Sequence, residues 1–424
     1  MAKTYDTYKD SGIAWIGEIP GEWEVCSLKY QTKFINGFAF NSNDFQKKGE
    51  MPVFRIGDII EDNISIKDNV FVNKQSTLNN YEVRKGDILL AMSGATTGKI
   101  GIIKNQIGYI NQRVGIVRST IQPWIFYNLK SNIFSEYVLL KAIGSAQPNI
   151  STENFNNYKI PFPPLSVQHS ISSFLDTKCG EIDSLISIQE EMISELLAYK
   201  QSVITEAVTK GLDKKAKMKN SGVEWIGDIP EEWKVCSIKY QIKFINGFAF
   251  DSNCFQQKGE MPVFRIGDII EDKISYEANV YVNKQNALNN YEVHKGDILL
   301  AMSGATTGKV GIVKEQIGYI NQRVGIIRSN IQPWIFYNLK TNIFSEYILL
   351  KAIGSAQPNI STENFKNYKI PLPPLPVQQA IATYLDEKTS QIDSLIALKQ
   401  SKIESLKEYK KSIIYEYVTG KKRV

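Results

Sequence analysis

Residues 86–118 read GDILLAMSGATTGKIGIIKNQIGYINQRVGIVR, and residues 296–328 read GDILLAMSGATTGKVGIVKEQIGYINQRVGIIR. The two stretches lie 210 residues apart in a chain of 424, so the repeat takes up nearly half of the sequence. Short runs of β-branched residues separated by glycines predict strands and tight turns within each stretch. The repeated stretch therefore predicts the strand core of a globular domain that occurs twice.

The segments around this core also occur twice and in the same order. An irregular arm pinned by aromatic packing is predicted for SGIAWIGEIPGEW (11–23). A helix that stops at Gly144 is predicted for IFYNLKSNIFSEYVLLKAIG (125–144), because its apolar residues recur at helical spacing. A stiff, extended connector is predicted for AQPNISTENFNNYKIPFPPLSVQ (146–168), because its prolines exclude an internal helix. Each repeat is thus a mixed, strand-rich α+β unit followed by a connector.

A long helix is predicted from Val167 to Lys210, where the sequence has no proline and one glycine. About 44 residues would give a helix of roughly 66 Å. Its apolar stripe predicts a coiled-coil or long-hairpin seam that is broad enough for more than one neighbour. The stripe needs a partner, which we expect to be the equivalent helix of the second repeat. The stripe consists of Leu175, Ile182, Gln189, Leu196 and Val203, flanked by Leu185, Met192, Tyr199, Cys179, Ile186, Ile193 and Ala207. The second copy keeps this register with Leu385, Ile392, Lys399, Leu406 and Ile413, flanked by Leu395, Tyr409, Ile396 and Ile403.

The predicted organisation follows from these segments. It consists of an N-terminal arm (1–20), domain 1 (21–160), a connector with the first long helix (161–212), a linker with domain 2 (213–370), and a connector with the second long helix (371–424). The tail VTGKKRV is similar to VTKGLDK at the start of the linker. The repeat therefore continues around a circle, and we expect the two ends of the chain to lie close together.

The two copies have diverged unevenly. Between residues 21–160 and 231–370, 23 of the 140 aligned positions differ, whereas about half of the positions differ between the two long helices. A recent duplication of the globular part alone would explain this pattern. So would a shared ligand for the two domains, combined with helix surfaces that complement each other. Both explanations predict that the two domains bind identical ligands.

Composition excludes several classes of protein. A net charge of +6 permits an anionic partner without requiring one. The four cysteines form no CxxC pair, and with only two histidines the chain has no zinc-type ligand set. The sequence has no run of about 18 apolar residues, and the N-terminus has no apolar signal region. We therefore expect a cytoplasmic protein with reduced thiols.

The motif SGATTGK (93–99) is similar to a phosphate-binding loop but departs from it in two ways. The P-loop pattern GxxxxGK[ST] needs four residues between its glycines, whereas Gly94 and Gly98 are separated by three. Lys99 is followed by Ile100 rather than by a magnesium-binding hydroxyl. A Gly-rich turn between strands, or a polar loop facing an anion such as a nucleic-acid backbone, explains the motif better.

The sequence carries no catalytic constellation, so recognition is the remaining chemistry. Asn111, Gln112 and Arg113 follow a predicted strand and are of the types that read adenine and guanine edges, although a solvated strand end would look the same. Gln147, Pro148 and Asn149 form a second polar cluster. Arg55 and Arg118 are further cationic candidates that could equally form ion pairs. The predicted DNA-binding residues are Ser93, Thr96, Thr97, Lys99, Asn111, Gln112 and Arg113, and in the second copy Ser303, Thr306, Thr307, Lys309, Asn321, Gln322 and Arg323.

Along its whole length the chain resembles the specificity subunits of type I restriction-modification systems. The resemblance rests on IGEIPGEW, GDILLAMSGATTGKIG, AQPNIS…YKIPFPPLSVQ and the helix beginning ISSFLD, and on the duplication of all four in this order. It implies two target-recognition domains joined by two long antiparallel helices with pseudo-two-fold symmetry. It also implies a non-catalytic subunit that holds two methyltransferase subunits, and often two restriction subunits, on bipartite double-stranded DNA.

In this family methylation is at adenine N6, so S-adenosylmethionine would be bound by the methyltransferase partner, and ATP with Mg²⁺ by a restriction partner. We expect this chain to bind no cofactor itself. The two recognition domains of such subunits usually differ, whereas here they are nearly the same, which predicts a palindromic or near-palindromic target. Asymmetry could enter at the differences Asn63/Lys273, Lys67/Glu277, Asp68/Ala278 and Arg84/His294. A stand-alone bivalent DNA-binding scaffold, a protein adaptor and a nucleotide-dependent enzyme are the alternatives.

Overall fold

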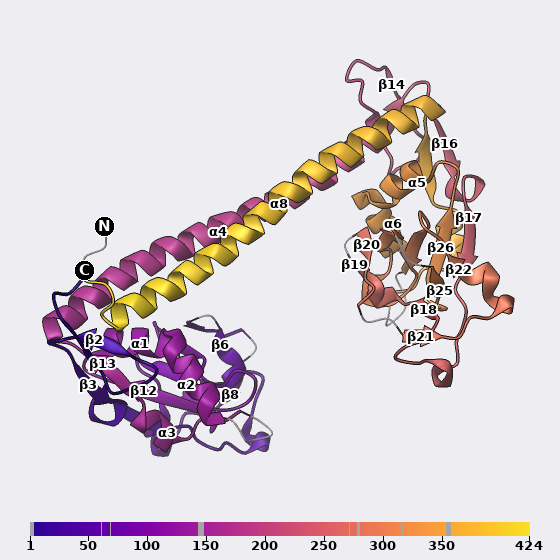
Figure 1. Ribbon diagram of the computed structural model, residues 1–424. Helices are drawn as coiled ribbons and strands as arrows, with labels where there is room; N and C mark the ends of the chain where they lie inside the picture. The colour runs from indigo at the N-terminus through magenta and orange to yellow at the C-terminus, as the bar shows by residue number, and fades with distance from the viewer. Residues whose placement is uncertain are drawn as a thin grey trace. The chain divides into compact units, whose positions relative to one another are not determined.

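The computed structural model describes residues 4–60, 62–67, 69–142, 148–270, 272–277, 280–314, 317–352 and 358–424. The chain divides into two compact units that cut across the sequence repeats. Unit 1 comprises Met1–Gln189 with Ser401–Val424, and unit 2 comprises Glu190–Gln400. Each unit holds one globular domain together with part of helix α4 (Leu165–Lys210) and part of helix α8 (Leu375–Val418) (Figure 1).

Domain 1 is built from short strands and three helices. Its strands are β1 (Tyr8–Asp10), β2 (Glu18–Pro20), β3 (Glu24–Ser27), β4 (Lys33–Asn36), β5 (Met51–Phe54), β6 (Ile59–Ile60), β7 (Asn63–Ile64), β8 (Val70–Val72), β9 (Ile88–Ala91), β10 (Ile100–Ile102), β11 (Tyr109–Ile110), β12 (Val114–Arg118) and β13 (Lys159–Phe162). Its helices are α1 (Gln122–Lys130), α2 (Asn132–Ala142) and α3 (Thr152–Asn157). The extended connector predicted for residues 146–168 is confirmed only around its prolines, where β13 pairs antiparallel with β3. It is wrong for residues 152–157, which form α3 behind the N-cap Ser151, and α4 already begins at Leu165.

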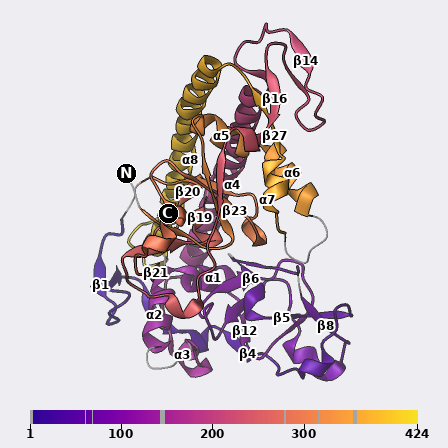
Figure 2. The ribbon, with the colours of Figure 1, turned by 90° about the vertical axis from the view of Figure 1, so that its right-hand side faces the viewer.

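The central sheet of domain 1 has the order β10-β9-β12-β4 and is antiparallel throughout. It is buried on both faces, which explains why β9 is apolar at every position. Ile88 and Leu90 face the cluster that contains α1, whereas Leu89 faces a second cluster with Phe54. A smaller sheet, β11-β5-β8, lies beyond that second cluster. Figure 2 shows α1 between the long helices and β12, which puts the sheet within reach of the helix pair.

Domain 2 repeats this architecture. Its strands are β14 (Met218–Asn220), β15 (Asp228–Pro230), β16 (Lys234–Ser237), β17 (Lys243–Asn246), β18 (Met261–Phe264), β19 (Ile269–Ile270), β20 (Asp272–Ile274), β21 (Val280–Val282), β22 (Glu292–Val293), β23 (Ile298–Ala301), β24 (Val310–Ile312), β25 (Gly318–Ile320), β26 (Val324–Arg328) and β27 (Lys369–Leu372). Its helices are α5 (Gln332–Leu339), α6 (Asn342–Ala352) and α7 (Thr362–Lys366). The central sheet, β17-β26-β23-β24-β20-β19, includes the equivalents of β7 and β6 at one edge.

The single helix predicted for residues 125–144 is wrong. The segment forms two helices, α1 and α2, with Ser131 in an extended conformation between them (φ −66°, ψ 149°). The hydroxyl of Ser131 donates to the carbonyl of Asn128 at 2.7 Å and so satisfies the end of α1. A serine that bonds to the preceding turn favours helix termination, which the apolar spacing alone did not reveal. The predicted stop, Gly144, lies outside the described residues.

Both long helices form, with 46 residues in α4 and 44 in α8. Within each unit they pack antiparallel. In unit 1 the ring of Phe174 lies 4.5 Å from that of Tyr417, and Asp183 Oδ1 lies 2.6 Å from Lys410 Nζ. In unit 2 Lys200 Nζ lies 2.7 Å from Asp393 Oδ1. The contacts of one unit thus recur in the other with the roles of α4 and α8 exchanged, and the predicted helix partner is confirmed.

One row of the predicted helix seam stays largely exposed when the two helices pack together. Leu175, Ile182 and Cys179 are buried as expected. Leu185, Met192 and Tyr199 are instead exposed, as are Leu395 and Tyr409 in α8. A seven-residue period places residues on a common face but does not say how wide the covered part of that face is. Two antiparallel helices cover a narrow strip and leave the third row open.

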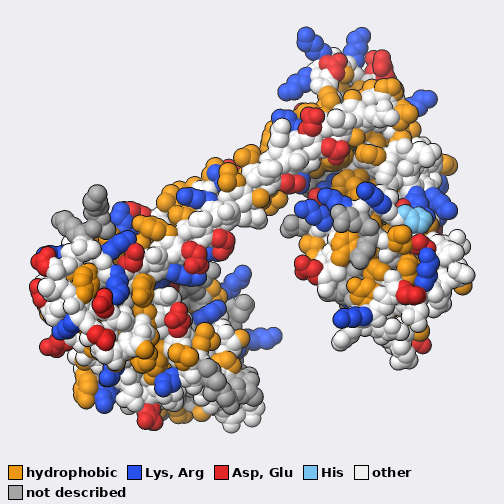
Figure 3. Space-filling model, viewed as in Figure 1, with side chains coloured by type: hydrophobic (Ala, Val, Ile, Leu, Met, Phe, Trp, Pro, Cys, Tyr) orange, Lys and Arg blue, Asp and Glu red, His pale blue; other side chains and the backbone are white. Residues whose placement is uncertain are grey.

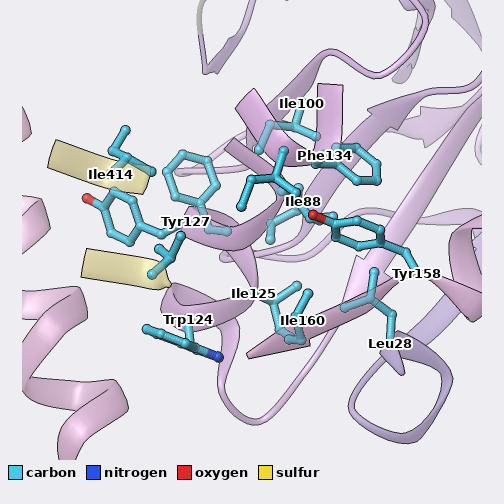
Figure 4. Close-up of a cluster of buried hydrophobic side chains, with 14 of the residues drawn as sticks. Leu28, Ile88, Ile100, Trp124, Ile125, Tyr127, Phe134, Tyr158, Ile160 and Ile414 are labelled. Carbon is cyan, nitrogen blue, oxygen red and sulfur yellow. The ribbon is translucent and has the colours of Figure 1, made fainter. Parts of the chain in front are cut away.

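The core of each domain is completed by the helix that belongs to the other repeat. Ile413, Ile414 and Val418 of α8 pack into the cluster around Trp124 and Tyr127 of domain 1 (Figure 4). In unit 2 the core of domain 2 is completed in the same way by Ile204, Ala207 and Val208 of α4, of which Ile204 and Val208 are the counterparts of Ile414 and Val418. A globular domain and the helix that follows it in sequence therefore do not make a closed core by themselves.

The two ends of the chain meet in unit 1, as predicted. The Tyr8 hydroxyl donates to the carbonyl of Gly420 at 3.1 Å, and the Arg423 guanidinium lies 5.7 Å from the Tyr5 ring. Gly420 ends α8 in the left-handed conformation, with φ of +71°, beside Trp23. Gly211 ends α4 in the same way beside Trp233, but there the chain continues directly into domain 2.

Replacing Ile414 with alanine is expected to destabilise unit 1 by about 2–5 kcal/mol, because the substitution leaves a cavity in a closed core. Ile414 is 2% exposed, whereas Leu398 on the same helix is 65% exposed and provides the control. Leu398→Ala should change stability by less than about 0.5 kcal/mol. Native-state hydrogen exchange measures the effect: amides of domain 1 should exchange faster in Ile414→Ala, and a change confined to α8 would contradict the shared core.

Candidate nucleic-acid interface

The loop 92–99 joins β9 to β10 as a tight antiparallel connection. Gly94 and Gly98 take φ values of +84° and +86°, which only glycine adopts without strain. The amide of Gly98 donates to Ala91 O, and the amide of Lys99 donates to Thr96 O, both closing the turn. The loop leads into a strand, whereas a phosphate-binding loop leads into a helix. The interpretation as a turn between strands is confirmed.

This loop is tied to a segment more than fifty residues further along the chain. The Thr97 hydroxyl donates to Gly94 O at 2.7 Å and to Pro148 O at 2.9 Å. Ser93 forms an isolated antiparallel bridge with Asn149, and the amide of Ile150 donates to Met92 O. Residues 148–150 therefore lie beside the loop, and Asn149 is brought next to Ser93.

The turn that carries Asn111, Gln112 and Arg113 connects β11 to β12. The side chain of Asn111 accepts a hydrogen bond from the amide of Gln112 at 2.6 Å, which shapes the turn and leaves Gln112 and Arg113 exposed at its tip. Gly37 passes so close to this turn that a Cβ there would lie 1.9 Å from Asn111 O. The amide of Met92 donates to Arg113 O and ties the turn to the loop after β9.

These segments surround an open polar hollow of about 630 Å³ in domain 1. Domain 2 has the equivalent hollow, of about 840 Å³. The residues that line the first hollow are Met92, Ser93, Gln112, Arg113, Pro148, Asn149, Ile150, Ser151 and Thr152. Those that line the second are Asn246, Met302, Ser303, Gln322, Arg323, Pro358, Asn359, Ile360, Ser361 and Thr362. Every lining residue of the first hollow has an identical counterpart in the second.

The polar groups of the hollow differ in what they already bind. Ser151 caps α3 by accepting from the amide of Asn154 at 3.1 Å, and the Thr152 hydroxyl donates to Asn36 Oδ1 at 2.8 Å. The hydroxyls of Ser93 and Ser303 are buried, and neither has a hydrogen-bond partner among the described residues.

The predicted DNA-binding residues fall into two groups. Ser93, Gln112 and Arg113 line the hollow, and so do Ser303, Gln322 and Arg323. The other predicted residues shape or flank the same loops without lining it, and these are Thr96, Thr97, Lys99, Asn111, Thr306, Thr307, Lys309 and Asn321. Lys99 and Lys309 are exposed. DNA contact by either group stays a prediction.

Ser151 and Thr152 line the hollow but were not predicted as site residues. They follow Asn149 in the polar run PNIST, which was the available signal. Of the second predicted cluster, Pro148 and Asn149 line the hollow, and Gln147 lies outside the described residues.

Arg118 is a structural residue rather than a free cation. Its Nε and one terminal nitrogen donate to the two carboxylate oxygens of Asp87, each at 2.8 Å, and it also donates to Glu82 O at 2.7 Å. Asp87 is buried, so this fork holds the end of β12 to the turn before β9. Arg55 lies 3.9 Å from Asp58 and likewise takes part in an ion pair.

The part of the chain that the structure describes has no group of three or more His, Cys, Asp or Glu side chains arranged to hold a metal ion. Within the same residues, no helix is both long and apolar enough to span a membrane. The visible surface of each unit carries lysine and arginine interspersed with acidic residues rather than a field of one sign (Figure 3).

Two domains of one fold, each with the same polar hollow, define a protein built for recognition at two places. The family model for the type I restriction modification DNA specificity domain matches the chain twice, at residues 20–197 and 230–408. The chain therefore belongs to this family, as its sequence resemblance implied.

Relatives match along nearly the whole length. The chain is 29% identical to the type I restriction enzyme MjaVIII specificity subunit of Methanocaldococcus jannaschii, over 96% of this chain and 94% of that one. It is 30% identical to the putative MjaX specificity subunit of the same organism, over 96% of each. A solved structure concerned with complex assembly and conformational transition of the type I R-M system contains a chain of the same fold, with a TM-score of 0.70, 16% identity, and coverage of 94% and 98%.

Replacing Arg118 with methionine is expected to lower the free energy of unfolding of domain 1 by about 3 kcal/mol, because Asp87 would be left buried without its counter-charge. Arg113→Met removes the same charge from an exposed turn and should change stability by less than about 0.5 kcal/mol. Urea unfolding of the two variants provides the comparison. Equal stabilities would show that the Arg118–Asp87 fork does not hold the domain together.

Proposed function

We propose that this chain is the DNA-reading subunit of a type I restriction-modification complex, and that each hollow receives the major-groove edge of one half-site. The observation that carries the proposal is the duplicated hollow, whose lining residues are the same in both domains. Membership of the family and the names of the relatives, which are specificity subunits of type I restriction enzymes, support it.

The side chains of the hollow suit base edges. Arg113 can donate two hydrogen bonds to O6 and N7 of guanine, and the amides of Gln112 and Asn149 can pair with N6 and N7 of adenine. The exposed Lys99 beside the hollow suits a phosphate. A protein with mixed surface charge gains affinity from such contacts without a large basic face.

The target is proposed to be palindromic in the bases that the hollows read. None of the 23 differences between the copies falls on a residue that lines the first hollow. The reciprocal helix contacts, Asp183 with Lys410 and Lys200 with Asp393, are of the kind made by two-fold repeats, which favours inverted half-sites. Asn63/Lys273, Lys67/Glu277 and Arg84/His294 lie outside the hollows, and Asp68/Ala278 lies outside the described residues.

The chain itself is proposed to be non-catalytic. Methylation at adenine N6 would be performed by two methyltransferase subunits that bind S-adenosylmethionine, and cleavage by restriction subunits that bind ATP and Mg²⁺ where the complex includes them. The proposed role of this chain is to select the DNA and to bring the methyltransferases to it.

The exposed rows on the long helices are proposed as the methyltransferase contacts. Leu185 and Tyr409 belong to unit 1, and Leu395 and Tyr199 to unit 2; these side chains are 46–57% exposed. All four are retained between the copies, although about half of the helix positions differ. Exposed apolar rows of this kind favour a partner helix.

Mapping N6-methyladenine in DNA exposed to the assembled complex tests the function. The expected motif has two half-sites, one the inverted complement of the other, separated by an unspecified spacer. Replacing Gln112, Arg113, Gln322 and Arg323 together with alanine should abolish specific methylation while leaving the complex assembled, because the base contacts would be lost. Two unrelated half-sites would contradict the palindrome, and unaltered specificity of the quadruple variant would contradict the role of the hollows.

Replacing Leu185 and Leu395 with glutamate is expected to weaken methyltransferase binding by about tenfold or more, because a charge would be buried in an apolar contact. Leu197→Glu is the matched control, since Leu197 is 53% exposed and its counterpart is Lys407. Gel filtration and titration calorimetry with the methyltransferase provide the measurement. Equal binding by the double variant and the control would place the contact elsewhere.

A further inference from the structure

A chain of alternating charges connects domain 1 to both long helices. Lys130, at the end of α1, forms an ion pair with Asp62 in the turn between β6 and β7. Asp62 Oδ2 also lies 3.8 Å from Nζ of Lys410, and that nitrogen lies 2.6 Å from Oδ1 of Asp183. Two of these residues belong to the domain, one to α4 and one to α8. The connection therefore requires both helices at the same time.

Unit 2 contains the same chain of charges with the two helices exchanged. Lys340 pairs with Asp272, whose carboxylate lies 3.7 Å from Nζ of Lys200. That nitrogen lies 2.7 Å from Oδ1 of Asp393. The lysine that reaches domain 1 thus comes from the second repeat, and the lysine that reaches domain 2 comes from the first.

The aspartate at the centre has a backbone conformation that few non-glycine residues adopt. Asp62 and Asp272 have φ values of +68° and +74°, and they are the only non-glycine residues with positive φ in the described parts of the chain. The carbonyl of Asp62 accepts from the amide of Ile102, which fixes the turn against β10. Strain of this kind is kept where the backbone has to aim a particular group.

The lysines are largely removed from water. The side chains of Lys130 and Lys410 are 14% exposed, and that of Asp62 is 29% exposed. Burial lowers the pKa of Lys130, and the neighbouring Asp62 carboxylate opposes this shift. Apolar packing of the domain against the helices is not directional, whereas a half-buried ion pair is satisfied only over a narrow range of distances. The charges can therefore add a directional constraint to the packing of the domain against the helices.

The four residues of the chain of charges in unit 1 are identical to their four counterparts in unit 2. This identity is informative for the two residues of each set that lie on the long helices. About half of the helix positions differ, and Gln201, the residue after Lys200, corresponds to Lys411. Lys411 pairs with Glu408 on its own helix, and its side chain is 61% exposed. Two adjacent lysines in α8 thus make different contacts, and only Lys410, which reaches the domain, has a lysine as its counterpart in α4.

We propose that Lys410 and Lys200 are positioning residues for DNA recognition, each provided by one repeat to set the angle of the recognition domain of the other repeat on the helix pair. The inference rests on the proposed function in that the two domains must bind one DNA molecule together. If each domain is held at a fixed angle, the complex tolerates only one spacer between the half-sites. Loosening the angle should relax the spacer requirement without altering how each half-site is read.

The test compares the assembled methyltransferase complex of the full-length chain with that of the Lys200→Met, Lys410→Met double variant. The probes are duplexes that carry the mapped motif with its natural spacer, the same motif with the spacer shortened or lengthened by one base pair, and a single half-site. The double variant should keep its affinity for the single half-site within about twofold, while its preference for the natural spacer falls by about tenfold. Arginine at both positions should restore most of the preference, because it keeps the charge.

Lys411→Met is the matched control and should behave as the unaltered chain does. Asp62→Asn with Asp272→Asn provides a second route, because asparagine tolerates positive φ and only the charge is lost. This variant should show the same relaxed spacer preference, and combining it with the lysine substitutions should add little.

An unchanged spacer preference in folded lysine and aspartate variants would overturn the proposal. So would a parallel loss of half-site affinity, spacer preference and thermal stability, since that result would indicate a general role in folding. Failure of the unaltered complex to bind its motif specifically would instead count against the proposed function.

Discussion

The structure depends on the closure of each domain's core by a helix of the other repeat. Ile414 and Val418 of α8 reach the core of domain 1, and Ile204 and Val208 of α4 reach that of domain 2. This exchange explains why the duplicated chain contains two long helices rather than two independent domains. Ile204 and Ile414 are identical counterparts, as are Val208 and Val418, and a smaller residue at any of these positions would open a cavity in the domain of the other repeat.

The proposed recognition of DNA and the proposed assembly with methyltransferase subunits involve different parts of the structure. Strands and tight turns present an open polar hollow in which Arg113 and Gln112 extend from a rigid turn that Gly37 allows to pack closely. The helices carry apolar rows and paired charges instead. Because the side chains of the hollow are anchored by the sheet, their geometry does not depend on whether the helix surface is occupied. In the proposal made above, the angle between domain 1 and the helix pair, and with it the orientation of the hollow, depends on the contact between Asp62 and Lys410.

Much of this could be predicted from the sequence, because the relevant signals are local or repeated. The duplication, the long helices, the extended proline-rich connector and the turn around Gly94 and Gly98 follow from spacing and backbone chemistry. The split between α1 and α2 was missed because Ser131 ends a helix by a hydrogen bond that apolar periodicity does not register. Periodicity identified the apolar stripe and its excess width, but it could not say which row, here the one with Leu185, the partner helix leaves exposed.

The candidate site could be predicted only in part, because it is formed by contacts between residues far apart in the chain. Ser93 and Asn149 meet across a bridge, and nothing in the sequence pairs them. Arg113 and Arg118 are five residues apart and chemically alike, yet one extends into the hollow and the other is committed to Asp87. Sequence chemistry predicted residues on loops that the fold brings together around the hollow, and the tertiary fold decides which of their side chains line it.

The division of the chain into units also has a consequence for its biosynthesis. Unit 2 is made of one continuous segment, Glu190–Gln400, and the part of α4 that it needs is synthesised before domain 2. Unit 1 needs Ser401–Val424, which are synthesised after all of unit 2. Domain 1 is translated before domain 2 but can close its core only after domain 2 has been made, so its apolar surface stays uncovered until residues 401–424 have been synthesised.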